Sequence, residues 1–267
     1  MAKSSTIITV GVLALQGGVV EHINLLHKAS SYIQSPDAVQ FNFLQVRTTA
    51  ELSQCDALII PGGESTTMAI VARRLGLLDP LREFVKVQHK PVWGTCAGLV
   101  MLAEQAAATK QGGQELVGGL NVRVLRNRYG TQLQSFVADL DLRFLGEGAA
   151  PFKAVFIRAP VVERVIAPEE KEREEEREEG ETGSAKAPGK EQGKREHVEV
   201  LGVYRGQGQQ AEPGEKGDIV AVRQGNVFGT SFHPELTDDV RIHVWWLEHV
   251  VDAVRHGKLP VVSDRSS

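Results

Sequence analysis

The sequence lacks the features that mark membrane and secreted proteins. It has no apolar run of about 18 residues, the length that a transmembrane helix requires. Residues 1–10 lack the basic region, the long apolar stretch and the cleavage site of a secretory signal, and they are too poor in arginine for a transit peptide. We therefore expect a soluble, cytoplasmic protein that does not contact a membrane.

Features of metal-dependent and nucleic-acid-binding proteins are also missing. No cluster of histidine and cysteine has the spacing of metal ligands, so we expect no metal and no cofactor. The formal net charge is −4, which gives no basic face for a nucleic acid. The two cysteines, Cys55 and Cys96, could pair in principle, but a disulfide framework is not expected without a secretion signal.

Strand-like and helix-like patterns alternate over the first half of the chain. Residues 7–15 form an almost continuous apolar run rich in β-branched residues, which is typical of a strand buried on both faces. Further strands are predicted at 39–46, 57–60 and 91–93, and helices at 19–29, 64–75, 80–88 and 99–108. This alternation predicts an α/β doubly wound, mostly parallel sheet with helices on both faces.

The pattern changes after about residue 115. Strand-like runs separated by turns favour antiparallel strands added to the same sheet, followed by a closing helix at 238–255; the runs are 121–126, 136–140, 152–157, 198–204, 219–222 and 227–231. We expect a single domain over residues 1–257 and a flexible C-terminal tail at 258–267. A second polar, glycine-rich loop is predicted at 205–217.

A charged insertion interrupts this second half at residues 168–197. It begins with EEKEREEEREE and contains nothing apolar larger than alanine up to residue 196, so it cannot bury enough surface to offset its ordering entropy. We expect a disordered loop in a hairpin-like connection, with residues 165–166 and 198–201 as neighbouring strands. A solvated helix and a partner-binding arm are the alternatives.

Cys96 lies in the stretch around which the chain is organised, Gly94-Thr95-Cys96-Ala97-Gly98. A strand, a sharp turn and a helix are predicted here, and the glycines permit backbone geometry that a Cβ atom would resist. The arrangement is that of a nucleophile elbow, and a cysteine at a helix N-terminus favours the thiolate. The alternative is a small, buried and inert cysteine.

His233 is the histidine best placed to serve such a thiolate as a base. It follows the strand-like run 227–231, and Pro234 biases it away from helical geometry. If the chain stays extended, Glu235 points the same way and can orient the imidazole. Gly62-Gly63 after a buried strand, together with the amide of Ala97, would supply oxyanion donors, although an ordinary strand-to-helix turn explains the glycines equally well.

These turns all follow the carboxyl ends of predicted strands, so they are expected to line one crevice. Gly94–Gly98 with a late Phe232-His233-Pro234-Glu235 resembles class I, triad-type glutamine amidotransferases. Further stretches make the chain similar to the PdxT/SNO family, the glutaminase subunits of pyridoxal 5′-phosphate synthase; they are Leu15-Gln16-Gly17, Pro61-Gly62-Gly63-Glu64-Ser65-Thr66-Thr67, Arg126-Asn127, Phe156-Ile157-Arg158-Ala159-Pro160 and Ser231 to Thr237. The resemblance covers about residues 7–255, apart from the insertion, and implies a three-layer, flavodoxin-like fold.

The resemblance also implies roles for individual residues. Cys96 attacks the amide carbon of L-glutamine, His233 acts as base and then acid, and Glu235 orients His233. Glutamine contacts map onto six positions, Gly63, Glu64, Ser65, Arg126, Ile157 and Arg158. The guanidinium group of an arginine can bind the α-carboxylate through two parallel hydrogen bonds, and the carboxylate of Glu64 could face the α-ammonium group. Surface ion pairing is the alternative for Arg126 and Arg158.

A partner follows from the resemblance as well. The family delivers ammonia to a TIM-barrel synthase subunit in a large hetero-oligomer, and Gln16-Gly17 lies where the family has a loop that responds to docking. Members of bacterial type lack an insertion like 168–197, which suggests a eukaryotic origin. Two alternatives stay open: a glutaminase subunit of another ammonia-channelling synthase, and a non-catalytic regulatory relative.

Overall fold

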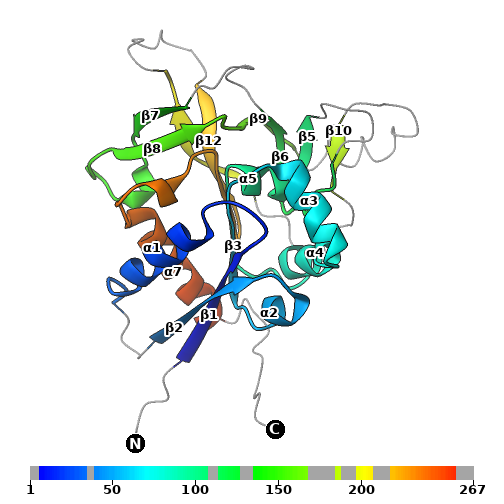
Figure 1. Cartoon of the computed structure of the whole chain (residues 1–267). Coiled ribbons are helices and arrows are strands. Elements are labelled where there is room, and N and C mark those ends of the chain that lie inside the picture. The colour runs from blue at the N-terminus through cyan, green and yellow to red at the C-terminus, as the bar shows by residue number, and fades with distance from the viewer. Residues whose placement is uncertain are drawn as a thin grey trace, which may run out of the picture.

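The buried apolar runs of the first half form the parallel part of a mixed sheet (Figure 1). The computed structural model describes residues 6–34, 39–107, 114–126, 135–167, 184–187, 197–206 and 217–256. The strands in this part run parallel in the order β2-β1-β3-β4-β13. Their bounds are β1 Thr6–Leu13, β2 Val39–Val46, β3 Ala57–Ile60, β4 Val92–Thr95 and β13 Val227–Thr230.

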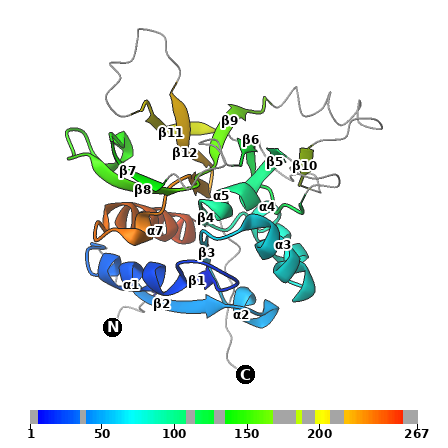
Figure 2. The ribbon, with the colours of Figure 1, turned by 45° about the horizontal axis from the view of Figure 1, so that its top comes forward.

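Helices cover both faces of these strands, as the alternating pattern predicts. Figure 2 shows α1 and α7 together on one side of β1, β3 and β4, and α3, α4 and α5 on the other. The bounds are α1 Val19–Ser30, α2 Thr49–Ser53, α3 Ser65–Arg74, α4 Leu78–Lys86, α5 Ala97–Leu102 and α7 Arg241–Arg255. The short helix α2 was not predicted, although Thr48 and Glu51 form a capping box at its start.

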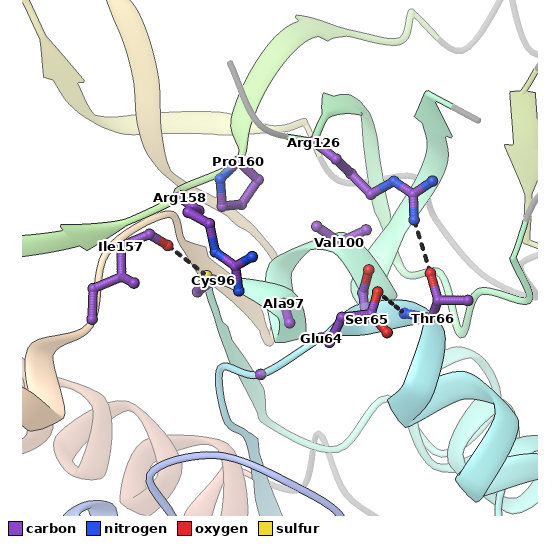
Figure 3. A pocket seen from close by; sticks show the side chains of 11 residues that line it. Glu64, Ser65, Thr66, Cys96, Ala97, Val100, Arg126, Ile157, Arg158 and Pro160 are labelled. Carbon is purple, nitrogen blue, oxygen red and sulfur yellow. Dashed lines mark hydrogen bonds between the residues drawn. The ribbon is translucent and has the colours of Figure 1, made fainter. Parts of the chain in front are cut away.

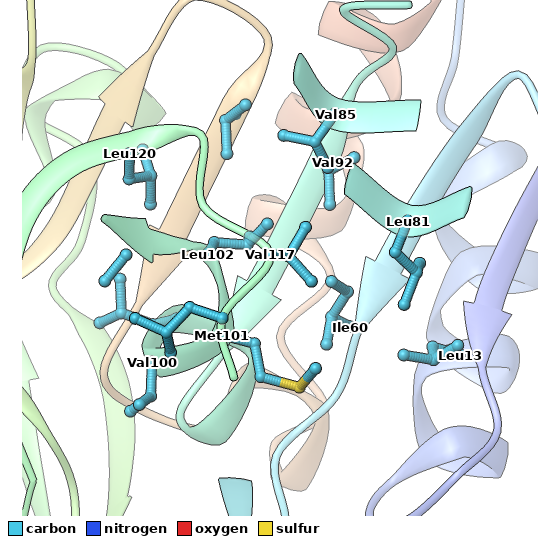
Figure 4. Packing of buried hydrophobic residues seen from close by; sticks show 14 of the residues in the cluster. Leu13, Ile60, Leu81, Val85, Val92, Val100, Met101, Leu102, Val117 and Leu120 are labelled. Atoms are coloured by element: carbon cyan, nitrogen blue, oxygen red, sulfur yellow. The ribbon is translucent and has the colours of Figure 1, made fainter. Parts of the chain in front are cut away.

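Two hydrophobic clusters fill the spaces between the sheet and the two helical layers. One joins the sheet to α3, α4 and α5, with Leu13, Ile60 and Leu81 among its fully buried side chains (Figure 4). The other joins the sheet to α1 and α7 and contains Trp93 and Trp246. Because consecutive residues of a strand face opposite ways, Ile59 and Ile60 contribute to different clusters.

The second half extends the sheet in the order β13-β12-β9-β6-β5-β10, with β11 paired to β12. Most of these pairings are antiparallel, as expected, but β5 and β6 run parallel. The bounds are β5 Ala103–Ala107, β6 Leu120–Leu125, β9 Val161–Val165, β10 Ser184–Lys186, β11 Glu199–Tyr204 and β12 Asp218–Gln224.

The prediction that all later strands join this sheet is wrong for two of them. β7 (Ser135–Leu140) and β8 (Phe152–Ile157) form a separate antiparallel pair, linked through the short 3-10 helix η1 (Arg143–Leu145). Phe152 and Phe156 from one face of β8 are fully buried in the cluster beneath α7. Packing on that apolar layer therefore replaces pairing with the main sheet.

The predicted helix over 99–108 is also wrong in its second half. The helix α5 ends at Leu102, and Ala103–Ala107 continues as β5 between β6 and β10. Every residue from 97 to 106 is buried, including the polar Glu104 and Gln105, so this stretch has no exposed face whose period could separate helix from strand.

The expected hairpin around the insertion does not form. β9 and β11 pair with β12 from opposite sides, since Ile219 of β12 faces Val162 on one side and Val203 on the other. Within the insertion, β10 pairs with β5. Residues 168–183 and 188–196 lie outside the described residues, as does the predicted tail at 258–267. None of the helices in the described ranges is long and apolar enough to cross a membrane.

A substitution at Gly98 tests how closely the helix α5 packs on the sheet. A Cβ atom there would lie 2.0 Å from the carbonyl oxygen of Ile60, which is backbone and cannot rotate away. We predict that Gly98→Ala lowers the free energy of unfolding by about 3 kcal/mol or more. Gly76 is the control, because its φ of +67° brings strain without any atom within 4 Å, so Gly76→Ala should cost only about 1–2 kcal/mol. Urea unfolding followed by tryptophan fluorescence measures both, and equal losses would contradict the prediction.

Candidate active site

Cys96 occupies a strained turn between β4 and α5. Its φ of 49° and ψ of −104° are unusual for a residue with a side chain, and such strain concentrates at functional sites. Gly94 and Gly98 make the turn possible, since a Cβ atom on Gly94 would lie 2.5 Å from the carbonyl carbon of Gly98. Cys96 is 6% exposed, and its Sγ atom lies 4.0 Å from the carbonyl oxygen of Ile157.

His233 and Glu235 meet at the same edge of the sheet. The Nδ1 atom of His233 lies 2.7 Å from Oε1 of Glu235, and the backbone N–H of His233 donates to the carbonyl of Val155 on β8 at 2.8 Å. The expected extended conformation is wrong, because Pro234–Leu236 forms a 3-10 turn, η2. His233 itself stays non-helical before Pro234, and the turn brings Glu235 back beneath the imidazole.

The electrostatics of this pair favour charged forms despite burial. Burial lowers the pKa of His233, but hydrogen bonds and charges from Cys96 and Glu235 outweigh it and raise that pKa to about 10. For Glu235, burial raises the pKa, while the neighbouring His22 and the hydrogen bond and charge of His233 lower it by more. The structure thus brings a thiol, an imidazolium and a carboxylate into one chain of contacts.

A cavity of about 280 Å³ opens beside Cys96. In Figure 3, Arg126 and Arg158 reach into it from the ends of β6 and β8, opposite Glu64, Ser65 and Thr66 at the start of α3. The remaining lining residues are Gly63, Ala97, Val100, Ile157 and Pro160. All six residues expected to contact glutamine therefore line one cavity next to the thiol.

The loop at Gln16-Gly17 packs against the glycines that follow β3. A Cβ atom on Gly17 would lie 1.8 Å from the carbonyl oxygen of Gly62, and the side-chain oxygen of Gln16 accepts a hydrogen bond from the backbone N–H of Glu64 at 2.9 Å. A side chain on Gly62 would meet His233, whose Cε1 atom lies 2.2 Å from the Cβ position. The oxyanion role of Gly62, Gly63 and Ala97 stays a prediction.

Comparison with known proteins assigns this site to a family. The model of the SNO glutamine amidotransferase family matches residues 12–194 and 187–252. The chain belongs to the SNO glutamine amidotransferase family. A probable pyridoxal 5′-phosphate synthase subunit PDX2 from Arabidopsis thaliana is 42% identical, with 90% of this chain and 85% of that protein covered.

Another relative and a solved structure show a similar likeness. Pyridoxal 5′-phosphate synthase subunit PdxT from Streptomyces avermitilis is 40% identical, with 94% of this chain and 96% of the relative covered. A crystal structure of a glutamine amidotransferase is 35% identical, has a TM-score of 0.62, and is matched over 91% of this chain and 98% of its own. The chain is therefore a glutamine amidotransferase, and the expected fold is confirmed.

Sequence reasoning missed Gln114 in this SNO-family site. Its side-chain oxygen accepts hydrogen bonds from Ser65 Oγ at 2.8 Å, from Thr66 Oγ1 at 3.3 Å and from Arg126 Nη1 at 2.7 Å. Gln114 thereby fixes the guanidinium group of Arg126 against the start of α3. Nothing in the surrounding sequence, a glycine pair and an apolar run, marks this residue in advance.

Glu64 differs in part from its expected role. Burial raises the pKa of its carboxyl group, but hydrogen bonds from the backbone and hydroxyl of Thr67 and from Thr66 lower it overall. The carboxylate caps α3, accepting from the N–H groups of Thr66 and Thr67 at 3.1 and 2.7 Å. It therefore stands ionised in the wall of the cavity, and its contact with an ammonium group stays a prediction.

The charge state of His233 can be tested directly. Because folding raises its pKa, the imidazolium stabilises the fold fully below pH 6.5, and this contribution is lost as the pH rises through about 10. We predict that Cys96→Ala lowers the pKa of His233, since it removes one hydrogen bond and one charge that raise it. NMR titration of the imidazole measures the shift, with Cys55→Ala as the control. An unchanged pKa in Cys96→Ala would show that the thiol does not interact with His233.

Proposed function

We propose that this chain is the glutaminase subunit of a pyridoxal 5′-phosphate synthase and hydrolyses L-glutamine to L-glutamate and ammonia. The relatives from Arabidopsis thaliana and Streptomyces avermitilis are named as subunits of that synthase, which supports the proposal. So does the name of a third relative, subunit SNO1 from Saccharomyces cerevisiae, which is 37% identical with 91% of this chain covered. The observation that carries it is the position of Cys96 between the His233–Glu235 pair and the cavity.

In the proposed reaction, the thiolate of Cys96 attacks the side-chain amide carbon of glutamine. The resulting oxyanion is stabilised by backbone N–H groups, for which Gly62, Gly63 and Ala97 are the proposed donors. His233 gives its proton to the leaving nitrogen, so ammonia departs and a glutamyl thioester remains. Water then attacks the thioester with His233 as base, and glutamate and the thiolate are released.

Charges in the cavity suit the backbone end of a free amino acid. Arg126 is proposed to bind the α-carboxylate, because its guanidinium group lines the cavity and is already oriented by Gln114 and Thr66. The ionised Glu64 is proposed to face the α-ammonium group. Gly63, Ser65, Ile157 and Arg158 complete the proposed contacts.

A second opening, which shares Cys96, Ile157 and Arg158 with the first, suits the delivery of ammonia to a partner. It has a volume of about 410 Å³ and lies against the Gln16-Gly17 loop, His233 and Leu236. We propose that a TIM-barrel synthase subunit docks on this side in a large hetero-oligomer, and that Gln16-Gly17 responds to the docking. A cytoplasmic location and a single domain over residues 1–257 stay predictions.

Two alternative functions can be distinguished by the partner that binds and by whether glutamate is released. A glutaminase of another ammonia-channelling synthase would co-purify with a different barrel and would not support pyridoxal 5′-phosphate formation. A non-catalytic relative would release no glutamate with any partner. Glutaminase activity measured with and without the synthase subunit is therefore the decisive experiment.

The nucleophile can be tested with the two cysteines as a matched pair. We predict that Cys96→Ala lowers glutamate release in the presence of the synthase subunit by about 1000-fold or more, while binding to that subunit persists. Cys55→Ala should keep full activity, because Cys55 is buried beside Leu52 and its burial raises its pKa to about 12. Wild-type turnover by Cys96→Ala would contradict the proposal.

Recognition of the α-carboxylate predicts a specific kinetic signature for Arg126. Arg126→Met should raise KM for glutamine by about 10- to 100-fold with a smaller change in kcat, because the lost contact forms in the ground state as well. Arg126→Lys should recover only part of the loss, since an ammonium group lacks the planar fork. An unchanged KM in Arg126→Met would assign the carboxylate to another residue.

A further inference from the structure

Two histidines lie buried behind the catalytic pair and have no part in the chemistry described so far. His22 comes from the first turns of α1 and His243 from α7, and both are fully buried. Both rings also pack against Trp93, at centroid distances of 5.7 and 4.8 Å. Burial of two imidazoles beside a tryptophan is costly unless their nitrogen atoms are satisfied, so their contacts need an explanation.

These contacts lead directly to Glu235. The Oε1 atom of Glu235 lies 2.7 Å from Nδ1 of His233. Its Oε2 atom is buried, has no hydrogen bond of good geometry, and lies 3.4 Å from Nε2 of His22. The other nitrogen of His22, Nδ1, lies 3.1 Å from Nε2 of His243. His22 Nε2 also lies 3.4 Å from Oγ1 of Thr95, the residue before the nucleophile.

The protonation state of this chain of groups follows from its surroundings. Burial lowers the pKa of His22, outweighing the opposite effect of the charges of Glu235 and Glu21, while the charge of His233 lowers it further. Burial and His22 together hold the pKa of His243 well below its usual range. Both rings are therefore neutral and carry one N–H group each.

The carboxylate of Glu235 beside His22 favours one pair of tautomers. A lone pair on His22 Nε2 would face and repel the carboxylate oxygen of Glu235, so we assign the proton to Nε2, which lies 3.4 Å from both Oε2 of Glu235 and Oγ1 of Thr95. His22 Nδ1 is then an acceptor, and Nε2–H of His243 donates to it. This leaves Nδ1 of His243 as an unprotonated nitrogen, in agreement with its lack of any partner among the described residues.

We propose that His22 is a positioning residue for the hydrolysis of glutamine. Its Nε2–H group faces Oε2 of Glu235 at 3.4 Å and stabilises the carboxylate, so that Oε1 stays aligned with His233, and His243 keeps His22 in the required tautomer. The inference rests on the proposed function and extends it, since neither histidine touches the cavity beside Cys96.

The placement of His22 also ties this chain of groups to the Gln16–Gly18 loop. The backbone N–H of His22 donates to the carbonyl of Gly18 at 3.0 Å. A Cβ atom on Gly18 would lie 2.9 Å from Cγ of Glu235, so the loop, the start of α1 and the carboxylate are packed as one unit. A displacement of α1 would therefore move the donor that holds Glu235.

Kinetics of three variants in the complex with the synthase subunit test the proposal. His22→Leu removes the donor and should lower kcat by about 10- to 100-fold, the loss that is typical when a group that orients a functional side chain is removed. The KM for glutamine should stay within about threefold. His22→Gln keeps an N–H donor near the Nε2 position and should recover most of the loss. Trp246→Phe is the packing control, because it changes a fully buried ring that contacts Trp93 without touching Glu235.

The pH dependence separates positioning from packing. In His22→Leu, the carboxylate of Glu235 loses its contact at Oε2 and can turn away from His233, which weakens the hydrogen bond that raises the pKa of His233. NMR titration should therefore give a lower pKa for His233 than in the wild type. Trp246→Phe should leave that pKa unchanged. Equal kinetic losses in His22→Leu and Trp246→Phe with an unchanged His233 pKa in both, or no recovery in His22→Gln, would overturn the proposal.

A measurement on the wild-type chain makes the test independent of folding in the variants. The ¹⁵N chemical shifts of His22 should report a neutral ring protonated at Nε2 at neutral pH. A proton on Nδ1 or an imidazolium would overturn the inference. Absence of glutamate release by the wild-type complex would instead refute the proposed function and leave the tautomer measurement valid.

Discussion

The close approach of Gly98 to the carbonyl of Ile60 is the constraint on which the site depends. It lets α5 begin directly above the end of β3, and this forces the strained turn that presents Cys96. Ile60 is followed at once by Pro61-Gly62-Gly63, so the same contact fixes the loop beside the thiol. One missing side chain thus sets the relative positions of the nucleophile and its proposed oxyanion donors.

The two hydrophobic clusters support different halves of the chemistry. The cluster under α3, α4 and α5 forms the floor of the cavity, where Ala97 and Val100 pack beneath the charged groups that suit an amino acid. The cluster under α1 and α7 surrounds the proton-transfer side, where Phe232 leads into His233 and Trp93 packs on the buried histidines. Cys96 lies between them, so the binding half and the acid–base half rest on separate packing layers.

Much of this arrangement was predictable, and the failures have physical causes. The bounds of β2 were predicted without error because apolar and polar residues alternate along it, and those of β3 because its four residues form a short buried apolar run. The same rule failed at Ala103–Ala107, where a helix and a strand are buried equally. The meeting of Cys96, His233 and Glu235 at one edge followed from topology, whereas Gln114 and His22 were missed because their roles arise from contacts between segments far apart in sequence. The helix α2 was missed although its capping box is visible as Thr48 and Glu51.

The position of Cys55 determines whether an oxidised Cys96 can form a disulfide within the chain. Cys55 precedes the amino end of β3, and Cys96 follows the carboxyl end of the neighbouring parallel strand β4. The two thiols therefore lie near opposite ends of these strands, about 15 Å or more apart. A disulfide between them would require their Cα atoms to lie within about 7 Å. The chain has no other cysteine. A sulfenic acid formed on Cys96 therefore has no resolving thiol in its own chain, and its rescue depends on a small-molecule thiol or on another protein.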